Sequence, residues 1–329
     1  MQRTKLNAEN SCRSNLPGFA TFAVALFLIA CFPASSLAQE KDQKTFPTAR
    51  AASHALFLAV QSDNEKAILA ILGHEGEPII SSGDPAEDKE NRANFARRYE
   101  QMHRLVKEPN GTTTLYIGAE NWPAPIPLVE KAGAWYFDTP AGVKEILFRR
   151  VGRNEMSAIR VCQELVAAER EYYAGHKSVF AQKIRSDQGQ DNGLYWPVAG
   201  SQPESPVGPM VAMASIDEGS GSANGAAEPF RGYYYRILAR QGKDAPGGEA
   251  EYVVNGKMTA GFAFVAYPAE YLNSGVMTFI VGKDGVIYQK DLGEKTPDLA
   301  KAMKEYNPDM SWEMVEDQPE QAADVQKTR

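Results

Sequence analysis

Cysteine is scarce in this chain of 329 residues, which contains three. Cys12 and Cys31 lie near the amino terminus, so a chain that loses this region by processing keeps only Cys162. A single thiol forms no internal disulfide, and we therefore expect the hydrophobic core to hold the fold together. The Cys162 thiol fits a reactive site or a buried helix position, and free cysteine is more often buried.

An excess of positive charge is also lacking, since the formal net charge is −7 at pH 7. Basic residues are scattered, whereas nucleic-acid binding requires a concentrated positive surface. The four histidines, His54, His74, His103 and His176, occur singly, without the close pairs of most zinc sites. Phosphate-loop and Gly-x-Ser-x-Gly motifs are missing, and the loop from Asp187 lacks the ligand spacing of an EF-hand. We therefore expect no nucleic-acid partner, no cofactor and no metal.

A long hydrophobic run occurs near the amino terminus, at Phe19–Ala30, after several basic residues. It is shorter than the roughly 20 residues that span a bilayer, and it is typical of a secretory signal peptide. We expect residues 1–38 to be removed by cleavage after Ala38, which yields a periplasmic or secreted protein without a membrane span. The letters LIAC that end at Cys31 resemble a lipobox, so a lipid anchor at Cys31 is the alternative.

Residues 39–153 predict an α+β domain that begins with helices. Caps and apolar spacing indicate one helix after Thr48 and a second after Ser62 or Asp63. A third follows in a polar stretch, where apolar residues recur at helical spacing as far as Leu105.

An antiparallel sheet is predicted next, and its prolines at residues 122–127 indicate an edge or a bulge. The expected strands are Thr112–Glu120, Ile126–Val129 and Ala134–Phe137, with a turn at residues 131–133. Helices on a curved antiparallel sheet are similar to the NTF2-like and cystatin-like classes.

Residues 154–315 predict a long helix, capped by Asn154, and an antiparallel β-meander. An irregular stretch at residues 177–231 separates them, and its Gly/Ser/Ala run is typical of a flexible tether. We expect the charged tail at residues 316–329 to be disordered. The strands are predicted in Gly232–Arg240, Gly261–Tyr271 and Gly275–Gly293.

Seven residues gather around the junction of the two predicted domains. They are Trp122, Asp138, Glu145, Arg149, Arg150, Asn154 and Glu155. In an enzyme, Asp138 or Glu145 would act in acid/base catalysis while the arginines bind an anionic substrate. In a structural role, Asp138 caps a turn and Glu145 pairs with Arg149 at a four-residue spacing. Arg150 and Glu155 then bridge the two halves, and we favour this structural interpretation.

Five motifs occur in order along the chain. They are WPAPIPLV from Trp122, WYFDTPAG from Trp135, RRVGRNE from Arg149, GLYWP from Gly193 and YPAEY from Tyr267. Together they resemble the DUF2950 family of exported bacterial proteins, over about Phe46 to Trp312. The resemblance implies export and no known reaction. The second-half helix and meander are also similar to the globular part of pilins and pseudopilins, although the hydrophobic first half of a pilin helix is lacking.

These observations predict a protein of the bacterial envelope that is a non-catalytic binding or assembly module. Its partner is expected to be an envelope protein or a small ligand, docked on the loop at Trp122 or on the tyrosine-rich strands. The alternative is a hydrolase, or another small-ligand enzyme, with an NTF2-like cavity lined by Trp122, Asp138 and Glu145.

Overall fold

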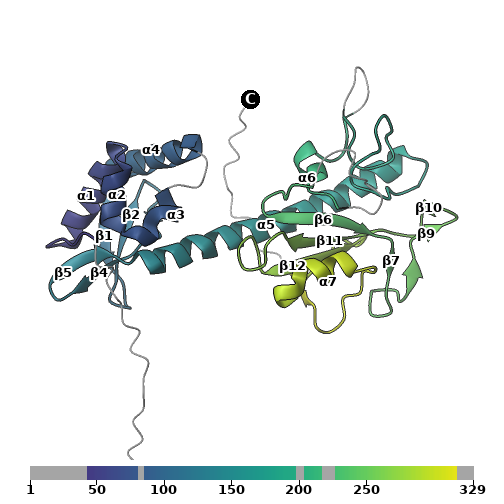
Figure 1. The fold of residues 1–329 in the computed structure, drawn as a ribbon. Coiled ribbons are helices and arrows are strands. Elements are labelled where there is room, and N and C mark those ends of the chain that lie inside the picture. Colours follow the sequence, from purple (N-terminus) through teal and green to yellow (C-terminus); the bar gives the residue numbers. More distant parts are fainter. Residues whose placement is uncertain (1–42, 81–84, 198–203, 217–226, 317–329) are drawn as a thin grey trace, which may run out of the picture. The chain divides into compact units, whose positions relative to one another are not determined.

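The computed structural model describes residues 43–80, 85–197, 204–216 and 227–316. The predicted signal peptide with both of its processing sites lies outside these residues, as do most of the predicted tether and tail. The described chain contains helices and antiparallel sheets in separate segments, so the predicted α+β class is confirmed (Figure 1). In this part of the protein, no helix combines the length and the apolar composition that a membrane span requires.

Four helices come first in the described chain, and side-chain caps explain where the two best-defined ones begin. The Thr48 side chain accepts a hydrogen bond from a first-turn backbone N–H at 3.0 Å, as predicted. Asn64, rather than Ser62 or Asp63, caps the second helix through a bond of 3.0 Å. Asp63 has a φ of +52°, which a helix cap does not adopt. The helices are α1 (Ala49–Gln61), α2 (Glu65–Leu72), α3 (Glu77–Ile80) and α4 (Pro85–Gln101), with a 3-10 turn η1 (His74–Gly76).

A five-stranded antiparallel sheet follows, in the order β1-β2-β4-β5 with β3 beside β2. The strands are β1 (His103–Lys107), β2 (Thr113–Ile117), β3 (Trp122–Pro123), β4 (Leu128–Lys131) and β5 (Ala134–Phe137). The three predicted strands are present, and the two-residue β3 agrees with the edge position expected for the prolines. The prediction of helical spacing as far as Leu105 is wrong, because residues 103–107 pair with β2 along its whole length.

Helix α5 (Thr139–Gly175) has 37 residues and begins earlier than predicted. Asp138 is its N-cap, and Pro140 lies in the first turn. Backbone N–H groups in the first turn have no acceptor within the helix, so a proline there costs no hydrogen bond. The prediction that Asn154 caps this helix is wrong, because Asn154 lies well inside it. The domain boundary predicted between residues 153 and 154 also falls inside α5, and the division into two domains stays a prediction.

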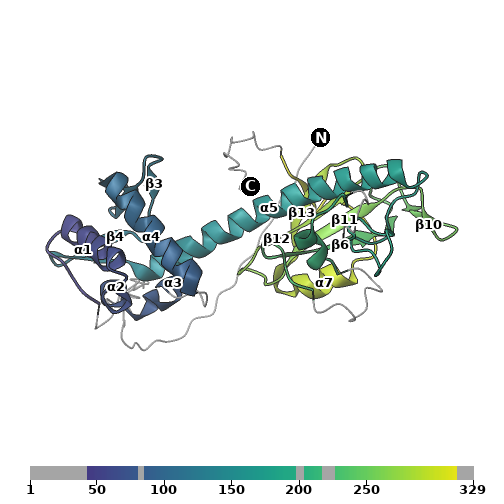
Figure 2. The ribbon, with the colours of Figure 1, turned by 90° about the horizontal axis from the view of Figure 1, so that it is seen from above.

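A second five-stranded antiparallel sheet has the order β14-β13-β12-β11-β6. All residues of β11 are buried, and both α5 and α7 (Thr296–Ala302) contact this strand, so both of its faces are covered (Figure 2). Each predicted strand segment is present, although shorter strands intervene between β6 and β11. The five strands are β6 (Tyr233–Leu238), β11 (Ala263–Pro268), β12 (Met277–Gly282), β13 (Ile287–Asp291) and β14 (Glu313–Met314). The shorter elements are α6 (Pro209–Met213), β7 (Arg240–Gln241), β8 (Ala250–Glu251), β9 (Val253–Val254), β10 (Lys257–Met258) and η3 (Gly293–Lys295).

The buried apolar side chains form two clusters that share no residue. One cluster joins α1, α2 and α4 to the first sheet and includes the fully buried Leu115 and Leu128. The other joins α5 and α7 to the second sheet and includes the fully buried Cys162, Phe264 and Phe279. Each sheet therefore has its own core.

Candidate functional site

The first turn of α5 is anchored to the end of α2. The Asp138 side chain caps α5, and the Thr139 hydroxyl donates a buried hydrogen bond to the Leu72 carbonyl at 2.6 Å. Gly142 lies against Ile126, because a Cβ added there would stand 2.6 Å from the Ile126 side chain. The first turn of α5 therefore lies close against residues of both α2 and the segment after β3.

Arg149 brings three of the predicted residues together. Its Nε donates to Glu145 Oε1 at 2.7 Å, so the ion pair expected from the four-residue spacing is present. Its Nη1 donates to the Pro123 carbonyl at 2.7 Å, and its guanidinium carbon lies 5.3 Å from the centre of the Trp122 ring. One arginine therefore attaches β3 to α5 through a charge-assisted hydrogen bond and a cation–π contact, while its ion pair with Glu145 lies within α5.

The other three predicted residues contact the turn before β12. Arg150 donates to the side-chain oxygen of residue 273, and Asn154 donates to the carbonyl of residue 274 at 2.9 Å. Glu155 Oε1 accepts backbone N–H bonds from residues 276 and 277 at 2.9 and 3.1 Å. Six of the seven residues thus form two groups of three with different partners, and Asp138 caps α5 apart from both, so the seven do not form one convergent site.

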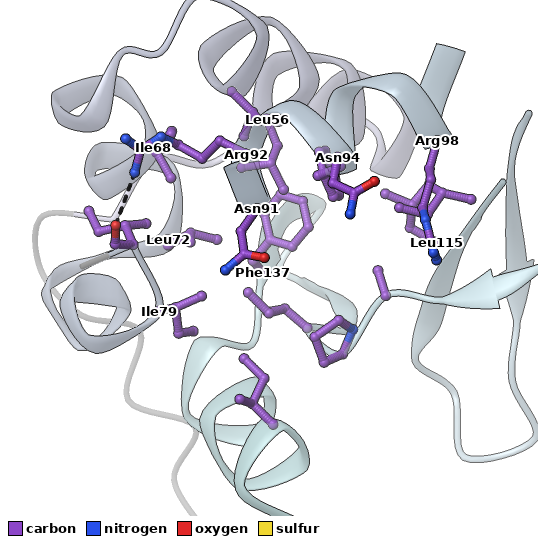
Figure 3. A pocket seen from close by; sticks show the side chains of 18 of the residues that line it. Leu56, Ile68, Leu72, Ile79, Asn91, Arg92, Asn94, Arg98, Leu115 and Phe137 are labelled. Atoms are coloured by element: carbon purple, nitrogen blue, oxygen red, sulfur yellow. Dashed lines mark hydrogen bonds between the residues drawn. The ribbon is translucent and has the colours of Figure 1, made fainter. Parts of the chain in front are cut away.

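An apolar cavity of about 480 Å³ lies between the first four helices and the first sheet (Figure 3). No sequence motif predicts it. Its apolar walls come from α1, α2, α3, β2 and residues 122–126, and its volume falls within the roughly 300–1,000 Å³ of small-molecule pockets. The lining includes Leu56 and Val60 of α1, Ile68 and Leu72 of α2, and Leu115 and Ile117 of β2.

Helix α4 supplies the polar wall of this cavity. Its polar lining residues are Asp88, Asn91, Arg92, Asn94 and Arg98. Their spacing of three and four residues places them on one helical face, and Figure 3 shows Asn91, Asn94 and Arg98 extending from the same side of α4. Asn91 and Asn94 are exposed, so the cavity opens to solvent along this helix.

Arg92 is held by two carboxylates outside the cavity and by the backbone carbonyl of Ile80 in the cavity wall. Its Nε lies 2.6 Å from Asp63 Oδ1, and its Nη2 lies 3.2 Å from Glu65 Oε1. Its Nη1 donates to the Ile80 carbonyl at 3.1 Å, which is the dashed line in Figure 3. The charge of Arg92 is therefore compensated by the protein itself.

Of the seven predicted residues, Trp122 lines the cavity, while Asp138 and Glu145 are not among its described lining residues. The sequence does contain one signal for a hollow at this position. The stretch that forms α4 is largely polar, with Phe95 and Tyr99 as its aromatic residues. Few apolar side chains of this helix are therefore available to fill the space between it and the sheet.

The remaining candidates lie in the core or at the surface. Cys162 is fully buried, and burial raises the pKa of its thiol to about 12. Tyr233, Tyr235 and Tyr267 are also fully buried, so these three rings are inaccessible to a docking partner. Asp187 accepts hydrogen bonds from two side chains near it in sequence, which lowers its pKa. Within the described ranges, no three His, Cys, Asp or Glu side chains are grouped as metal ligands.

The fold and the cavity define an α+β protein with a hollow between helices and an antiparallel sheet. The chain belongs to the family described as "Protein of unknown function (DUF2950)", whose model matches residues 43–315. The family expected from the five sequence motifs is thereby confirmed. No curated protein and no solved structure matches the chain. The likeness to NTF2-like, cystatin-like and pilin-like folds stays a prediction.

Proposed function

We propose that this protein is exported to the bacterial envelope and acts there as a non-catalytic module that binds a small ligand in the cavity. The cavity is the observation that carries this proposal. Apolar walls with a few polar groups on one side are typical of small-molecule sites. Burial of apolar ligand surface in such a site contributes about 25 cal/mol per Å².

The composition of the lining supports binding rather than turnover. The enzyme alternative places Trp122, Asp138 and Glu145 around one cavity. Asp138 caps α5 and Glu145 pairs with Arg149, and neither belongs to the described lining. That lining contains one carboxylate, Asp88, and no histidine, whereas acid/base chemistry commonly uses a carboxylate pair or a histidine.

Export is supported by the signal-peptide pattern of residues 1–38. The intact mass of the protein recovered from the envelope of an expressing bacterium tests this part of the proposal. A chain that starts at Gln39 supports cleavage after Ala38, and a lipid-modified start at Cys31 supports the anchored alternative. An unprocessed chain that stays in the cytoplasm contradicts export.

Binding is tested with N-phenyl-1-naphthylamine, a neutral dye whose fluorescence rises in apolar sites. The protein purified from the envelope should bind the dye saturably. Asn94→Trp introduces a large ring from an exposed lining position and should weaken binding about tenfold, which corresponds to about 1.4 kcal/mol. Ala93→Trp is the matched control, because Ala93 is exposed on α4 and outside the lining.

Both variants are first compared with the unaltered protein by circular dichroism, since the comparison requires that they fold. Equal dye affinity in the two folded variants contradicts the proposed location of the site. Failure of the unaltered protein to bind the dye saturably contradicts the binding function.

A further inference from the structure

Arg98 lies in the last turn of α4 and lines the cavity near β2 (Figure 3). The backbone carbonyls of Arg98 and Met102 both accept from the Gly118 N–H, at 3.0 and 2.9 Å, which ties this helix end to the end of β2. Gly118 has a φ of +76°, and a Cβ added there would stand 3.5 Å from Arg98 Cγ. The positive φ favours glycine at this turn, and the backbone bonds fix where the Arg98 side chain starts.

The two arginines of the cavity wall differ in their partners. Arg92 is paired with the carboxylates of Asp63 and Glu65. The half-buried Arg98 side chain makes no ion pair or hydrogen bond with any residue that the structure describes. Glu120 forms no ion pair with Arg98, although a Cβ added at Gly118 would stand 3.1 Å from Glu120 Oε2, so this carboxylate lies on the same side of the turn as the arginine stem. A guanidinium stays charged and carries five donors, so its partial removal from water without a partner is unfavourable.

The rest of the cavity is suited to an alkyl chain. From Arg98, the lining continues over Leu115 and Ile117 of β2 to Ile68 and Leu72 of α2. The volume of about 480 Å³ is near the lower end of the roughly 300–1,000 Å³ range of ligand pockets, which suits one chain better than two.

We infer that the ligand is a single-chain alkyl carboxylate, whose chain lies among the apolar walls and whose head group pairs with Arg98. An ionised carboxylate matches the planar guanidinium through two parallel hydrogen bonds. It also supplies an ion-pair partner, which none of the described residues gives this arginine. This inference rests on the proposed binding function and names the ligand class of the same cavity.

Displacement of N-phenyl-1-naphthylamine by dodecanoate and by dodecanol tests the inference, because the two probes share a chain and differ in head group. The unaltered protein should release the dye at an about tenfold lower concentration of dodecanoate. Arg98→Gln should abolish this preference and leave displacement by dodecanol unchanged. Arg97→Gln removes the same charge from an exposed residue outside the lining and should keep the preference.

Arg98→Lys keeps the charge without the planar fork and should retain part of the preference, which provides a test if Arg98→Gln fails to fold. Equal displacement by the two probes in the unaltered protein, or a preference that survives Arg98→Gln, overturns the carboxylate assignment and leaves the binding proposal standing. Loss of the preference in Arg97→Gln overturns the assignment as well, because general surface charge then explains it. Absence of saturable dye binding instead contradicts the binding proposal itself.

Discussion

The two sheets differ in how the space beside them is filled. In the second core, large aromatic side chains from β6, β11 and β12 are completely buried. Tyr233, Phe264, Tyr267 and Phe279 are each 0 % exposed. In the first core, the space between the sheet and α4 contains a cavity of about 480 Å³. A smaller hollow of about 230 Å³ lies beside the second core, but it is lined by α5 and residues 206–211 and not by the strands of the second sheet.

Residue type accounts for this difference. Aromatic side chains from neighbouring strands fill the second core, and such close packing maximises dispersion contacts. In the first core, aliphatic residues of β2 line a cavity whose edge at α4 carries Asn91, Asn94 and Arg98. Side chains around a hollow lack neighbours on one side and lose the dispersion contacts that those neighbours would make. The first core therefore contributes less to the free energy of unfolding than its number of buried residues implies. The second sheet is thus packed on filled space, whereas the first leaves a cavity of about 480 Å³ beside it.

The largest effect is expected from the same change, isoleucine to alanine, made once in each core. Ile280→Ala removes a fully buried side chain from β12 and should lower the free energy of unfolding by about 3–4 kcal/mol. Ile68→Ala removes the same groups from the cavity wall and should lower it by only about 2 kcal/mol, because that wall already lacks contacts on one side. Urea unfolding followed by circular dichroism measures both values. Equal losses would mean that the first core is packed as densely as the second.

A smaller effect is expected where β3 is attached to α5. Arg149→Met removes the bonds to Glu145 and Pro123 and should lower the free energy of unfolding by about 2 kcal/mol. Since β3 forms part of the cavity wall, dye affinity should also fall, by about threefold. Arg153→Met changes an exposed arginine of the same helix and should alter neither quantity. Unchanged dye affinity in Arg149→Met would mean that this arginine does not hold the wall of the hollow core.

Local signals were sufficient to predict most strands of both sheets. The turn at residues 131–133 is an example, because Ala132 and Gly133 both adopt the positive φ that a tight hairpin requires. The sequence analysis places the start of α5 too late, although Asp138 and Pro140 form a recognisable helix start. Gly142 lies soon after that start, and an interior glycine disfavours a helix by about 1 kcal/mol. Its close contact with Ile126 shows that tertiary packing overrides this preference.

The place and size of the cavity could not be predicted, although the polar composition of α4 is one signal for a hollow. It is the space that remains when α4 lies over the sheet, and the two bonds from the Gly118 N–H help to set that position. Such contacts between distant segments leave no local pattern in the sequence. The cluster of seven residues was found because its members lie close together along the chain. Their partners, among them Pro123 and Asn273, could not be inferred in the same way.

The smallest expected effect tests whether the second core is truly filled, and it occurs at high pH. Burial raises the pKa of Cys162 to about 12 from an ordinary value of 9.0. Because the folded-state pKa is the higher one, the contribution of this thiol to stability is complete below pH 9 and is lost between pH 9 and about pH 12. The resulting decrease in the free energy of unfolding is about 1.4 kcal/mol at about pH 10.

Urea unfolding at pH 8 and at about pH 10 measures this decrease, in a chain whose Cys12 and Cys31 are replaced by serine. Cys162→Ala in the same background serves as the control, and its stability should fall less over this interval because it lacks the thiol. Burial, and to a smaller extent the Cys162 thiolate, raises the pKa values of Tyr233 and Tyr235, so at about pH 10 both stay protonated in the two folded chains and their titration in the unfolded state is common to both. An identical pH dependence would mean that Cys162 ionises in the folded state at its ordinary pKa. Solvent would then reach the second core, and the contrast between a filled core and a hollow one would disappear.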